Sequence, residues 1–388
     1  MLVDLETARK IIEEKVKEKL KTKVVDTIDA VGRIAAEDIV STRNIPERDL
    51  SAMDGFAFRL EDYIKFKKLK IVGKIFPDTD QIPILNEGEA YYVTTGAPIP
   101  KNADTVVRFE ASKVINEYLY VGEEVFKGKD IRPAGDDVKA GEIVIHKGKQ
   151  ITPYDIGILY RIGVKNLKII YYTSCIFAIG DELKPFNDVD NSGITDSISP
   201  IILTILKKFG EAKYLGVVND DPKKIEEKLM EAVEFCDIIF TIGGSSVGEH
   251  DYVKRVVRNN GELLFEGVTV NVLKRGGVGI INDKPIVILP GQVVSAVTTF
   301  HEHGLNVISK MCKIPLRKTI KVKLGTDVEV RHKMDSLYLF VSQGEYVLPL
   351  RWGVGLYSEI TKADSFGILK RDRVYRKGDE IEVQKLLL

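Results

Sequence analysis

The hydrophobic positions of residues 166–315 follow two alternating patterns along the chain. Short apolar runs rich in β-branched residues predict buried strands, and the segments between them have the apolar spacing of helices. The run IIFTI at 238–242 is continuous and apolar, as in strands that are buried on both faces. The other predicted strands are 167–172, 175–179, 212–218, 263–272 and 285–289, and the predicted helices are 199–209, 222–234, 252–258 and a long one that ends near 311.

This alternation predicts a doubly wound α/β domain, in which ligands bind beyond the carboxyl ends of the strands. The segment KRGGVGIIND is predicted to connect the last two strands. Asp220, Gly243 and Pro290 each follow a predicted strand, so we expect them to converge at one edge of the sheet.

The rest of the chain has a different pattern. A charged amphipathic helix is predicted from Asp4 to about Leu20, and a helix is predicted to start at Thr152–Pro153, since proline suits the first helical position. Short strands with Gly, Pro and Asn breaks fill two β-rich modules. We therefore predict an α/β multidomain protein with four parts: an elongated linker domain (1–45 with 128–165), an inserted β domain (46–127), the α/β domain (166–315) and a C-terminal β domain (316–388).

Length and composition agree with a multidomain globular protein. The 388 residues suffice for two to four domains, and 44% are hydrophobic. The formal net charge is zero, which gives no sign of a nucleic acid or membrane surface as partner. No apolar run approaches a membrane span, and the charged N-terminus is unlike a signal peptide, so a cytoplasmic location is expected.

The cysteines and the paired histidines suggest no metal site. Cys175, Cys236 and Cys312 are scattered without a paired motif, which argues against a disulfide scaffold or a zinc site. Cys175 and Cys236 fall at buried strand positions and are interpreted as small apolar residues. His301 and His303 are two residues apart at a helix start, so they do not share a face as a zinc pair would.

The glycine turn after the strand 238–242 is the strongest candidate for a ligand site. Gly243, Gly244 and Gly248 allow backbone N–H groups to close on an anion, and a helix follows. Ser246 can donate a hydrogen bond to a phosphate oxygen, and Asp251 can hold a Mg²⁺ ion that bridges to it. The alternative is an ordinary strand-to-helix turn with a serine cap.

Two carboxylates are predicted to share that Mg²⁺. Asp220 and Asp251 both follow buried strands, and two carboxylates near a pyrophosphate can stabilise charge on the leaving phosphate through one metal ion. Asp221 is then interpreted as a helix cap, the usual role of an aspartate before proline at a helix start.

Seven segments, in order, resemble the MoeA family of molybdopterin molybdenumtransferases, which includes the E domain of gephyrin. The resemblance covers nearly the whole chain and rests on SAMDGFAFR, TTGAPIPKNADTVVRFE, DIRPAGDDVKAGE, AIGDEL, GVVNDDP, GGSSVGEHDY and LPGQVVSA. It implies that the α/β domain is MogA-like and binds molybdopterin. It also implies that adenylylated molybdopterin is the substrate, that molybdate enters its dithiolene, and that AMP leaves with Mg²⁺. The implied assembly is a homodimer whose sites combine the α/β domain of one subunit with the inserted β domain of the other.

The resemblance assigns further site residues. Asp54 of SAMDG matches an essential aspartate, against the alternative of a turn aspartate that bonds its own backbone. Thr95 of TTGAP matches a site threonine, against a strand-end hydroxyl. Asp137 matches a site carboxylate, although Asp136 is an equal candidate on spacing. Glu182 of GDEL follows a strand end and can contact metal or a hydroxyl, against a solvated surface role.

Three loops depart from the family pattern. KRGGVG keeps Lys274 but has Gly277 and Val278 where the family has a second lysine and proline. PGQVVSA retains Pro290, Gly291 and Ser295 but lacks the second proline, and GITDSIS has Ile198 in place of asparagine. Because the family handles oxyanion and pterin here, Lys274 and the neighbouring Arg275 are the candidates for holding molybdate or tungstate, and the alternative is a solvated basic turn.

Three functions follow from these observations. The leading hypothesis is an enzyme that inserts molybdate or tungstate into adenylylated molybdopterin with Mg²⁺-dependent release of AMP. The second is a paralogue that binds the pterin nucleotide as a carrier or scaffold without inserting metal, which the altered loops favour. The third is the molybdopterin adenylyltransferase reaction, against which the β modules and SAMDG argue.

Overall fold

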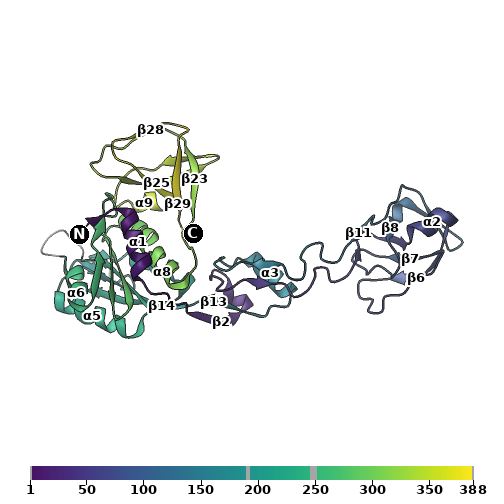
Figure 1. Cartoon of the computed structure of the whole chain (residues 1–388), viewed down its shortest axis with the longest axis horizontal. Helices are drawn as coiled ribbons and strands as arrows, with labels where there is room; N and C mark the ends of the chain where they lie inside the picture. The colour runs from purple at the N-terminus through teal and green to yellow at the C-terminus, as the bar shows by residue number, and fades with distance from the viewer. Residues whose placement is uncertain (1, 189–192, 245–250, 387–388) are drawn as a thin grey trace. The chain divides into compact units, whose positions relative to one another are not determined.

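The chain folds into two compact units. The computed structural model describes residues 2–188, 193–244 and 251–386. The first unit comprises Met1–Glu37, Lys147–Thr152 and Asn166–Leu388, and the second comprises Asp38–His146 and Pro153–Lys165. Figure 1 labels several elements of each unit. The four-part division expected from the sequence is finer than this and stays a prediction.

A six-stranded mixed sheet forms the centre of the first unit. Its strand order is β17-β14-β18-β22-β21-β19; the first four strands pair in parallel, and β21 pairs antiparallel with both β22 and β19. β14 lies between β17 and β18. The chain passes from β14 to β17 on one side and then crosses back to β18 on the other side. The predicted doubly wound arrangement is confirmed. The bounds are β14 (Tyr172–Ile179), β17 (Gly210–Val218), β18 (Ile238–Gly243), β19 (Glu262–Phe265), β21 (Gly277–Ile281) and β22 (Lys284–Leu289).

Helices cover both faces of this sheet because its strands are apolar on both faces. Along β14, Ile176 and Ala178 belong to one hydrophobic cluster and Cys175 and Phe177 to another, which is the alternation that a strand imposes. The first cluster is packed by α1 (Leu5–Lys15), α4 (Ser199–Leu206), α7 (Val293–Thr299) and α8 (Leu305–Cys312), and the second by α5 (Pro222–Phe235) and α6 (Tyr252–Asn260).

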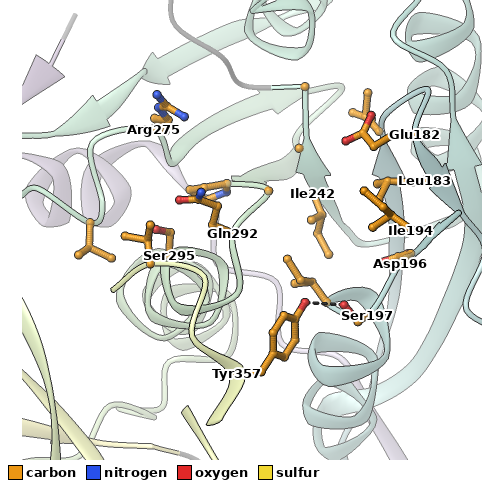
Figure 2. A pocket seen from close by; sticks show the side chains of 18 of the residues that line it. Glu182, Leu183, Ile194, Asp196, Ser197, Ile242, Arg275, Gln292, Ser295 and Tyr357 are labelled. Atoms are coloured by element: carbon orange, nitrogen blue, oxygen red, sulfur yellow. Dashed lines mark hydrogen bonds between the residues drawn. The ribbon is translucent and has the colours of Figure 1, made fainter. Parts of the chain in front are cut away.

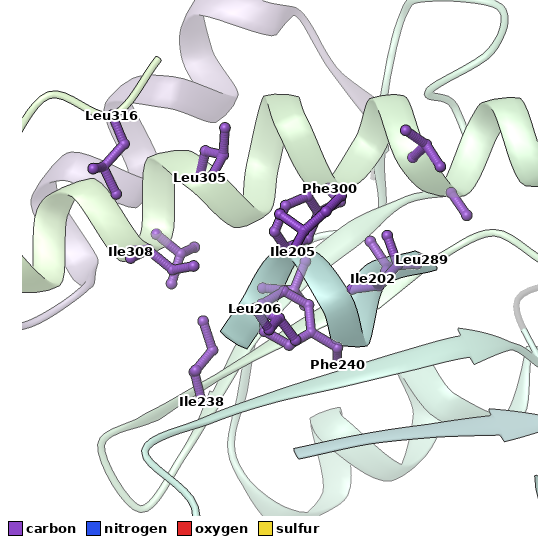
Figure 3. Packing of buried hydrophobic residues seen from close by; sticks show 14 of the residues in the cluster. Ile202, Ile205, Leu206, Ile238, Phe240, Leu289, Phe300, Leu305, Ile308 and Leu316 are labelled. Carbon is purple, nitrogen blue, oxygen red and sulfur yellow. The ribbon is translucent and has the colours of Figure 1, made fainter. Parts of the chain in front are cut away.

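The first cluster is shown in Figure 3. The rings of Phe240 from β18 and Phe300, which follows α7, have centroids 5.5 Å apart, with Ile202 of α4 and Leu289 of β22 in the same cluster. Aromatic pairs at this separation add to the stability that burial provides. This packing fixes β18 and β22 against α4 and the helical segment that follows β22.

Several predicted element boundaries are wrong, and three of them change the reading of the fold. The N-terminal helix ends at Lys15 rather than near Leu20, because the chain turns extended at Val16 and the polar residues beyond it are exposed. The predicted strand 263–272 is two short strands, β19 and β20 (Gly267–Val268), the second of which pairs with β1 (Leu2–Val3). The predicted connection KRGGVGIIND contains β21, because its apolar residues pair with β22.

The long helix near residue 311 is interrupted by one π-helical turn, Phe300–Gly304. Glu302 in this turn is buried, and its carboxylate accepts hydrogen bonds from Arg9 (2.7 Å) and Arg317 (3.0 Å). His303 is fully buried and, within the described residues, neither ring nitrogen has a hydrogen-bond partner. His301 bonds the Val297 carbonyl through Nδ1 at 2.7 Å. Both histidines are therefore core residues.

The expectation that no disulfide is present is wrong. Cys175 and Cys236 are joined in a disulfide, with Cα atoms 6.0 Å apart, while Cys312 is a buried free thiol. Cys175 lies within β14, and Cys236 lies just before the neighbouring β18. The 61 residues between the two cysteines hide this proximity from the sequence.

A closed five-stranded barrel forms the C-terminal part of the first unit. It has its own hydrophobic cluster, which includes Phe340 and Val347. The predicted C-terminal β-rich module is thus observed as a barrel. Its order is β23 (Thr319–Leu324), β26 (Tyr346–Pro349), β25 (Ser336–Gln343), β27 (Ser365–Leu369) and β29 (Glu380–Lys385).

The second unit contains another six-stranded sheet. Along β5, Phe56 and Phe58 enter one cluster and Ala57 another, so both faces are covered. Two further helices, α2 (Leu60–Phe66) and α3 (Pro153–Arg161), belong to this unit. Among the described residues of the whole chain, no helix combines the length and apolarity that a membrane crossing requires. The sheet order is β8 (Thr105–Arg108), β5 (Gly55–Phe58), β7 (Glu89–Val93), β6 (Leu69–Ile75), β10 (Tyr118–Val121) and β9 (Ser112–Ile115).

The two buried histidines predict acid sensitivity of the first unit. Burial lowers the pKa of His301 to about 4 and that of His303 to about 3. Unfolded histidine takes up a proton near pH 6.5, so below that pH the unfolded state binds more protons than the folded state. Stability therefore falls as the pH drops through this window, by about 1.4 kcal/mol per pH unit for each histidine. Replacing His303→Leu should reduce the slope of stability between about pH 6 and pH 4, measured by calorimetry.

The matched control is His146→Gln, because the His146 side chain is exposed. Its effect on the slope should be smaller than that of His303→Leu. A His303→Leu slope equal to the wild-type slope would contradict the prediction.

Candidate functional site

A cleft of about 970 Å³ opens in the first unit at the carboxyl ends of the parallel strands. Ile179 ends β14, Ile242 and Gly243 end β18, and Pro290 follows β22, and all four line the cleft. Asp220, which follows β17, lines it as well, so the predicted convergence of Asp220, Gly243 and Pro290 is observed. The cleft lies at the carboxyl end of β14, whose two neighbours β17 and β18 are reached by connections on opposite sides. Doubly wound folds bind ligands at such a point.

Most of the predicted cleft residues meet in this one cavity. The sequence-predicted residues that line it are Glu182, Asp220, Gly243, Gly244, Lys274, Pro290, Gly291 and Ser295. Ser246 and Gly248 lie outside the described residues. Figure 2 shows Arg275, Gln292 and Ser295 on one side of the cleft and Glu182 on the other. The cavity therefore has a side with basic and neutral polar groups and a side with a carboxylate.

The glycine turn after β18 requires glycine for steric reasons. Gly243 and Gly244 have φ values of +83° and +61°, which L side chains rarely adopt. A Cβ atom on Gly243 would lie 2.6 Å from the carbonyl oxygen of Ile179 in β14. The chain thus leaves the sheet tightly against β14, and the backbone itself borders the cleft.

The acidic side of the cleft joins two strand-end loops. The Asp181 carboxylate accepts hydrogen bonds from the side-chain amide of Asn219 (3.0 Å) and the backbone N–H of Asp220 (3.2 Å). The backbone N–H of Asp181 donates in return to the Asp220 carboxylate at 3.4 Å. These bonds hold the loops after β14 and β17 together. Sequence reasoning missed Asp181, although it adjoins Glu182 in the GDEL motif.

Asp221 is the helix cap that was predicted. Its carboxylate accepts hydrogen bonds from the backbone N–H groups of Lys224 (3.1 Å) and Lys223 (2.8 Å), which lower its pKa. The two neighbouring aspartates thus have different positions. Asp220 borders the cleft, and Asp221 stabilises the start of α5.

Asp251 has a different environment from Asp220. One carboxylate oxygen accepts a 2.8 Å hydrogen bond from Lys254, whose side chain is buried, and the other oxygen is buried without a partner among the described residues. Asp251 is not one of the described residues that line the cleft. Its predicted sharing of a metal ion with Asp220 stays a proposal.

The carboxylates suit a magnesium ion that arrives with a phosphate. Within the described ranges, no group of three or more His, Cys, Asp or Glu side chains is arranged to hold a metal. Mg²⁺ needs no such cage, because it keeps several waters and binds through one or two carboxylates together with substrate phosphates. Asp220 in the cleft and the unpartnered oxygen of Asp251 fit that chemistry.

The basic side of the cleft carries Lys274 and Arg275. They are the lysine and arginine side chains among the described lining residues. Gly277 and Val278, at the positions where the family has a second lysine and proline, lie in β21 and are buried. Ser295 is a buried residue near the start of α7 and lines the cleft close to Gln292.

Residues of the C-terminal part complete the cleft, and sequence reasoning assigned none of them. His332, Trp352, Val354 and Tyr357 line it. The signal that could have found them is Trp352, the chain's sole tryptophan, set between Arg351 and Gly353 in a stretch without strand or helix spacing.

The other predicted site residues lie in the second unit. One Asp54 carboxylate oxygen accepts hydrogen bonds from the Thr95 backbone N–H (2.7 Å) and hydroxyl (2.8 Å), and these two bonds lower the pKa of Asp54. The alternative of a turn aspartate that bonds only its own backbone is wrong for Asp54. Of the neighbouring pair, Asp136 binds Arg132 at 3.0 Å, whereas Asp137 lies 4.0 Å from Arg132.

Comparison with known proteins covers the chain almost completely. The model of the MoeA N-terminal region (domain I and II) matches residues 3–163, and that of the probable molybdopterin binding domain matches residues 175–310. A protein of Methanocaldococcus jannaschii named for molybdopterin biosynthesis is 31% identical over 99% of this chain and 98% of its own. A molybdopterin molybdenumtransferase of Haemophilus influenzae is 31% identical over 80% of this chain and 78% of its own.

A solved structure has the same fold. The crystal structure of a molybdopterin biosynthesis MoeA protein from Pyrococcus horikoshii superposes with a TM-score of 0.82 and 26% identity. The match covers 99% of this chain and all of that one. This chain therefore has the fold of that protein.

The strand-end glycine provides a first test of the site. Gly243→Ala should destabilise the first unit by about 2 kcal/mol or more, because it forces a left-handed backbone and a clash with Ile179. Gly291→Ala is the matched control in the same cleft, since its Cβ would meet only Gly243 Cα at 3.5 Å. Thermal unfolding should separate the two variants. Equal unfolding temperatures would refute the steric role of Gly243.

The Asp54–Thr95 contact provides a second test. Thr95→Val removes the hydroxyl donor and keeps the backbone donor, so the pKa of Asp54 should rise part of the way to its ordinary value. Carboxyl-carbon NMR titration measures this shift, with Thr79→Val as a control in which Asp54 should not change. An unchanged Asp54 pKa in Thr95→Val would show that the hydroxyl contact is absent in solution.

Proposed function

The chain belongs to the MoeA family of molybdopterin molybdenumtransferases, enzymes of molybdenum cofactor biosynthesis, and on this premise we propose the reaction that it carries out. It inserts molybdate or tungstate into adenylylated molybdopterin and releases AMP with the help of Mg²⁺. The observation that supports this most is the cleft of about 970 Å³ with a carboxylate side and a basic side. A pyrophosphate that arrives with Mg²⁺ needs carboxylates that bind the metal ion, and an oxyanion needs positively charged side chains.

In this proposal the acidic side and the glycine turn hold the pyrophosphate. The backbone at Gly243–Gly244 approaches the phosphates closely, because no Cβ atoms stand in the way. Asp220 and Asp251 would hold Mg²⁺, which would offset the negative charge that develops on the phosphate of the departing AMP. The contacts of Asp181 keep Asp220 in place for this role.

The basic side holds the oxyanion in this proposal. Lys274 and Arg275 supply the positive charge, and Ser295 supplies a hydroxyl donor. Binding here would place molybdate or tungstate in the same cavity as the phosphate end of the substrate. Asp54 and Thr95 of the second unit would contribute to the site of the other subunit in a homodimer, as the family resemblance implies, with Asp137 as a further carboxylate. The proposal includes assembly as a homodimer.

One observation favours a second candidate function. The buried strand positions of Gly277 and Val278 leave Lys274 and Arg275 as the lysine and arginine side chains of the described lining. A protein with weakened oxyanion binding would act as a carrier for the pterin nucleotide. Turnover that depends on molybdate or tungstate distinguishes the enzyme from the carrier.

The proposed reaction is tested with adenylylated molybdopterin, Mg²⁺ and either oxyanion. AMP release should require the oxyanion, and Asp220→Ala should slow it about a hundredfold by removing charge at the metal. Asp221→Ala is the matched control: it should lower the unfolding temperature, through loss of the α5 cap, and retain AMP release. Chromatography of the released nucleotide measures both. Tight binding of the pterin nucleotide, with no AMP release in the presence of either oxyanion, would reject the enzyme and support the carrier.

A further inference from the structure

The C-terminal barrel extends a segment to the cleft, residues 350–357. The segment starts from the barrel, where the Leu350 N–H donates to the Leu339 carbonyl of β25 at 2.9 Å. It then meets the start of α7, where the Val294 N–H donates to the Val354 carbonyl at 2.9 Å. The segment is therefore tied both to the barrel and to helix α7, which packs on the sheet.

A third contact fixes the end of this segment. The Tyr357 hydroxyl is hydrogen-bonded to the hydroxyl of Ser197, and both residues line the cleft. Figure 2 shows this bond, with Tyr357 reaching from the C-terminal part towards Ser197. Between Leu350 and Tyr357, the backbone thus has a defined course along one side of the cleft.

Trp352 lies in the middle of this fixed segment. It is the only tryptophan of the chain and is 43% exposed, although burial of an aromatic side chain of this size is strongly favourable. Its ring lies beside that of His332, with centroids 4.7 Å apart and planes at 41°. His332 comes from the connection between β24 (Val328–Glu329) and β25. Two aromatic rings from separate parts of the barrel thus meet at the cleft.

We infer that Trp352 and His332 form a stacking wall that selects a flat nitrogen heteroaromatic ring of the substrate. The inference rests on the proposed function, because adenylylated molybdopterin carries two such rings, the pterin and the adenine. Flat heteroaromatic rings have apolar faces, which stack on indole and imidazole, and polar edges, which need hydrogen bonds. The wall determines specificity and affinity, and it leaves the chemistry to the strand-end residues.

The sole tryptophan is also a direct reporter of this contact. Titration of the wild-type protein with AMP and, separately, with free pterin should change Trp352 fluorescence in a saturable manner for the ring that stacks. The response to one ligand and not the other identifies that ring. N-acetyltryptophanamide titrated in the same way corrects for light absorbed by pterin. Saturable binding by calorimetry with no fluorescence change for either ligand would overturn the inference.

Substitution provides the second measurement. Trp352→Ala should weaken binding of the stacking ligand about ten- to a hundredfold, which is the usual loss when a base loses its aromatic partner. Trp352→Phe should restore most of the affinity, since phenylalanine keeps an aromatic face. Tyr346→Ala removes a similarly exposed aromatic ring from β26 of the same barrel, outside the described lining, and should bind as the wild type does. Equal affinities for Trp352→Ala and the wild type would overturn the inference.

Kinetics separates this inference from the proposed function. Trp352→Ala should raise the KM for adenylylated molybdopterin and leave kcat within about twofold. The lost contact is one that the ring makes equally in the ground state and in the transition state. AMP release by the wild type with an unchanged KM in Trp352→Ala would reject the stacking wall alone. Loss of pterin or AMP affinity in Trp352→Ala, from a wild type that releases no AMP, would support the wall and reject the proposed reaction.

Discussion

The parallel alignment of β14, β17, β18 and β22 is the constraint on which the rest of the first unit depends. Parallel strands bring their carboxyl ends to one edge of the sheet. Residues that follow different strands, and are far apart in sequence, therefore meet at that edge. The strands hold this alignment because they are apolar on both faces and helices cover each face. The close approach of Gly243 to Ile179 is a local consequence, since two adjacent parallel strands end at the same level.

Features that repeat along the chain were predictable from the sequence. The continuous apolar run at 238–242 predicted β18, and the proline after Asp221 predicted the start of α5. Once the strands were placed, the general behaviour of parallel sheets was enough to gather Asp220, Gly243 and Pro290 at one edge. These predictions needed only local periodicity and one rule about sheet edges.

Features that depend on distant partners were not predictable in this way. Cys175 and Cys236 gave no pairing signal, because the register of β14 against β18 brings them together. The sequence around Asp181 does not distinguish it from an ordinary polar loop residue, because its role depends on hydrogen bonds with Asn219 and Asp220. The barrel residues at the cleft were hidden for the same reason: their position depends on how the barrel packs on α7, which no local pattern records.

The departures from the family pattern have a structural consequence that narrows the chemistry of the site. Gly277 and Val278 pair with β22 and are buried, and a lysine at such a position would lose its hydration without a partner. In the proposed reaction, the charge that the described lining offers to an oxyanion comes from Lys274 and Arg275, just before the strand begins. Arginine offers a planar fork of donors and lysine a point charge, so the pair can contact a tetrahedral oxyanion from two directions. The basic side chains of the described lining thus stand directly before β21, and the carboxylate side, where Asp181 joins the loops after β14 and β17, lies on other strand ends.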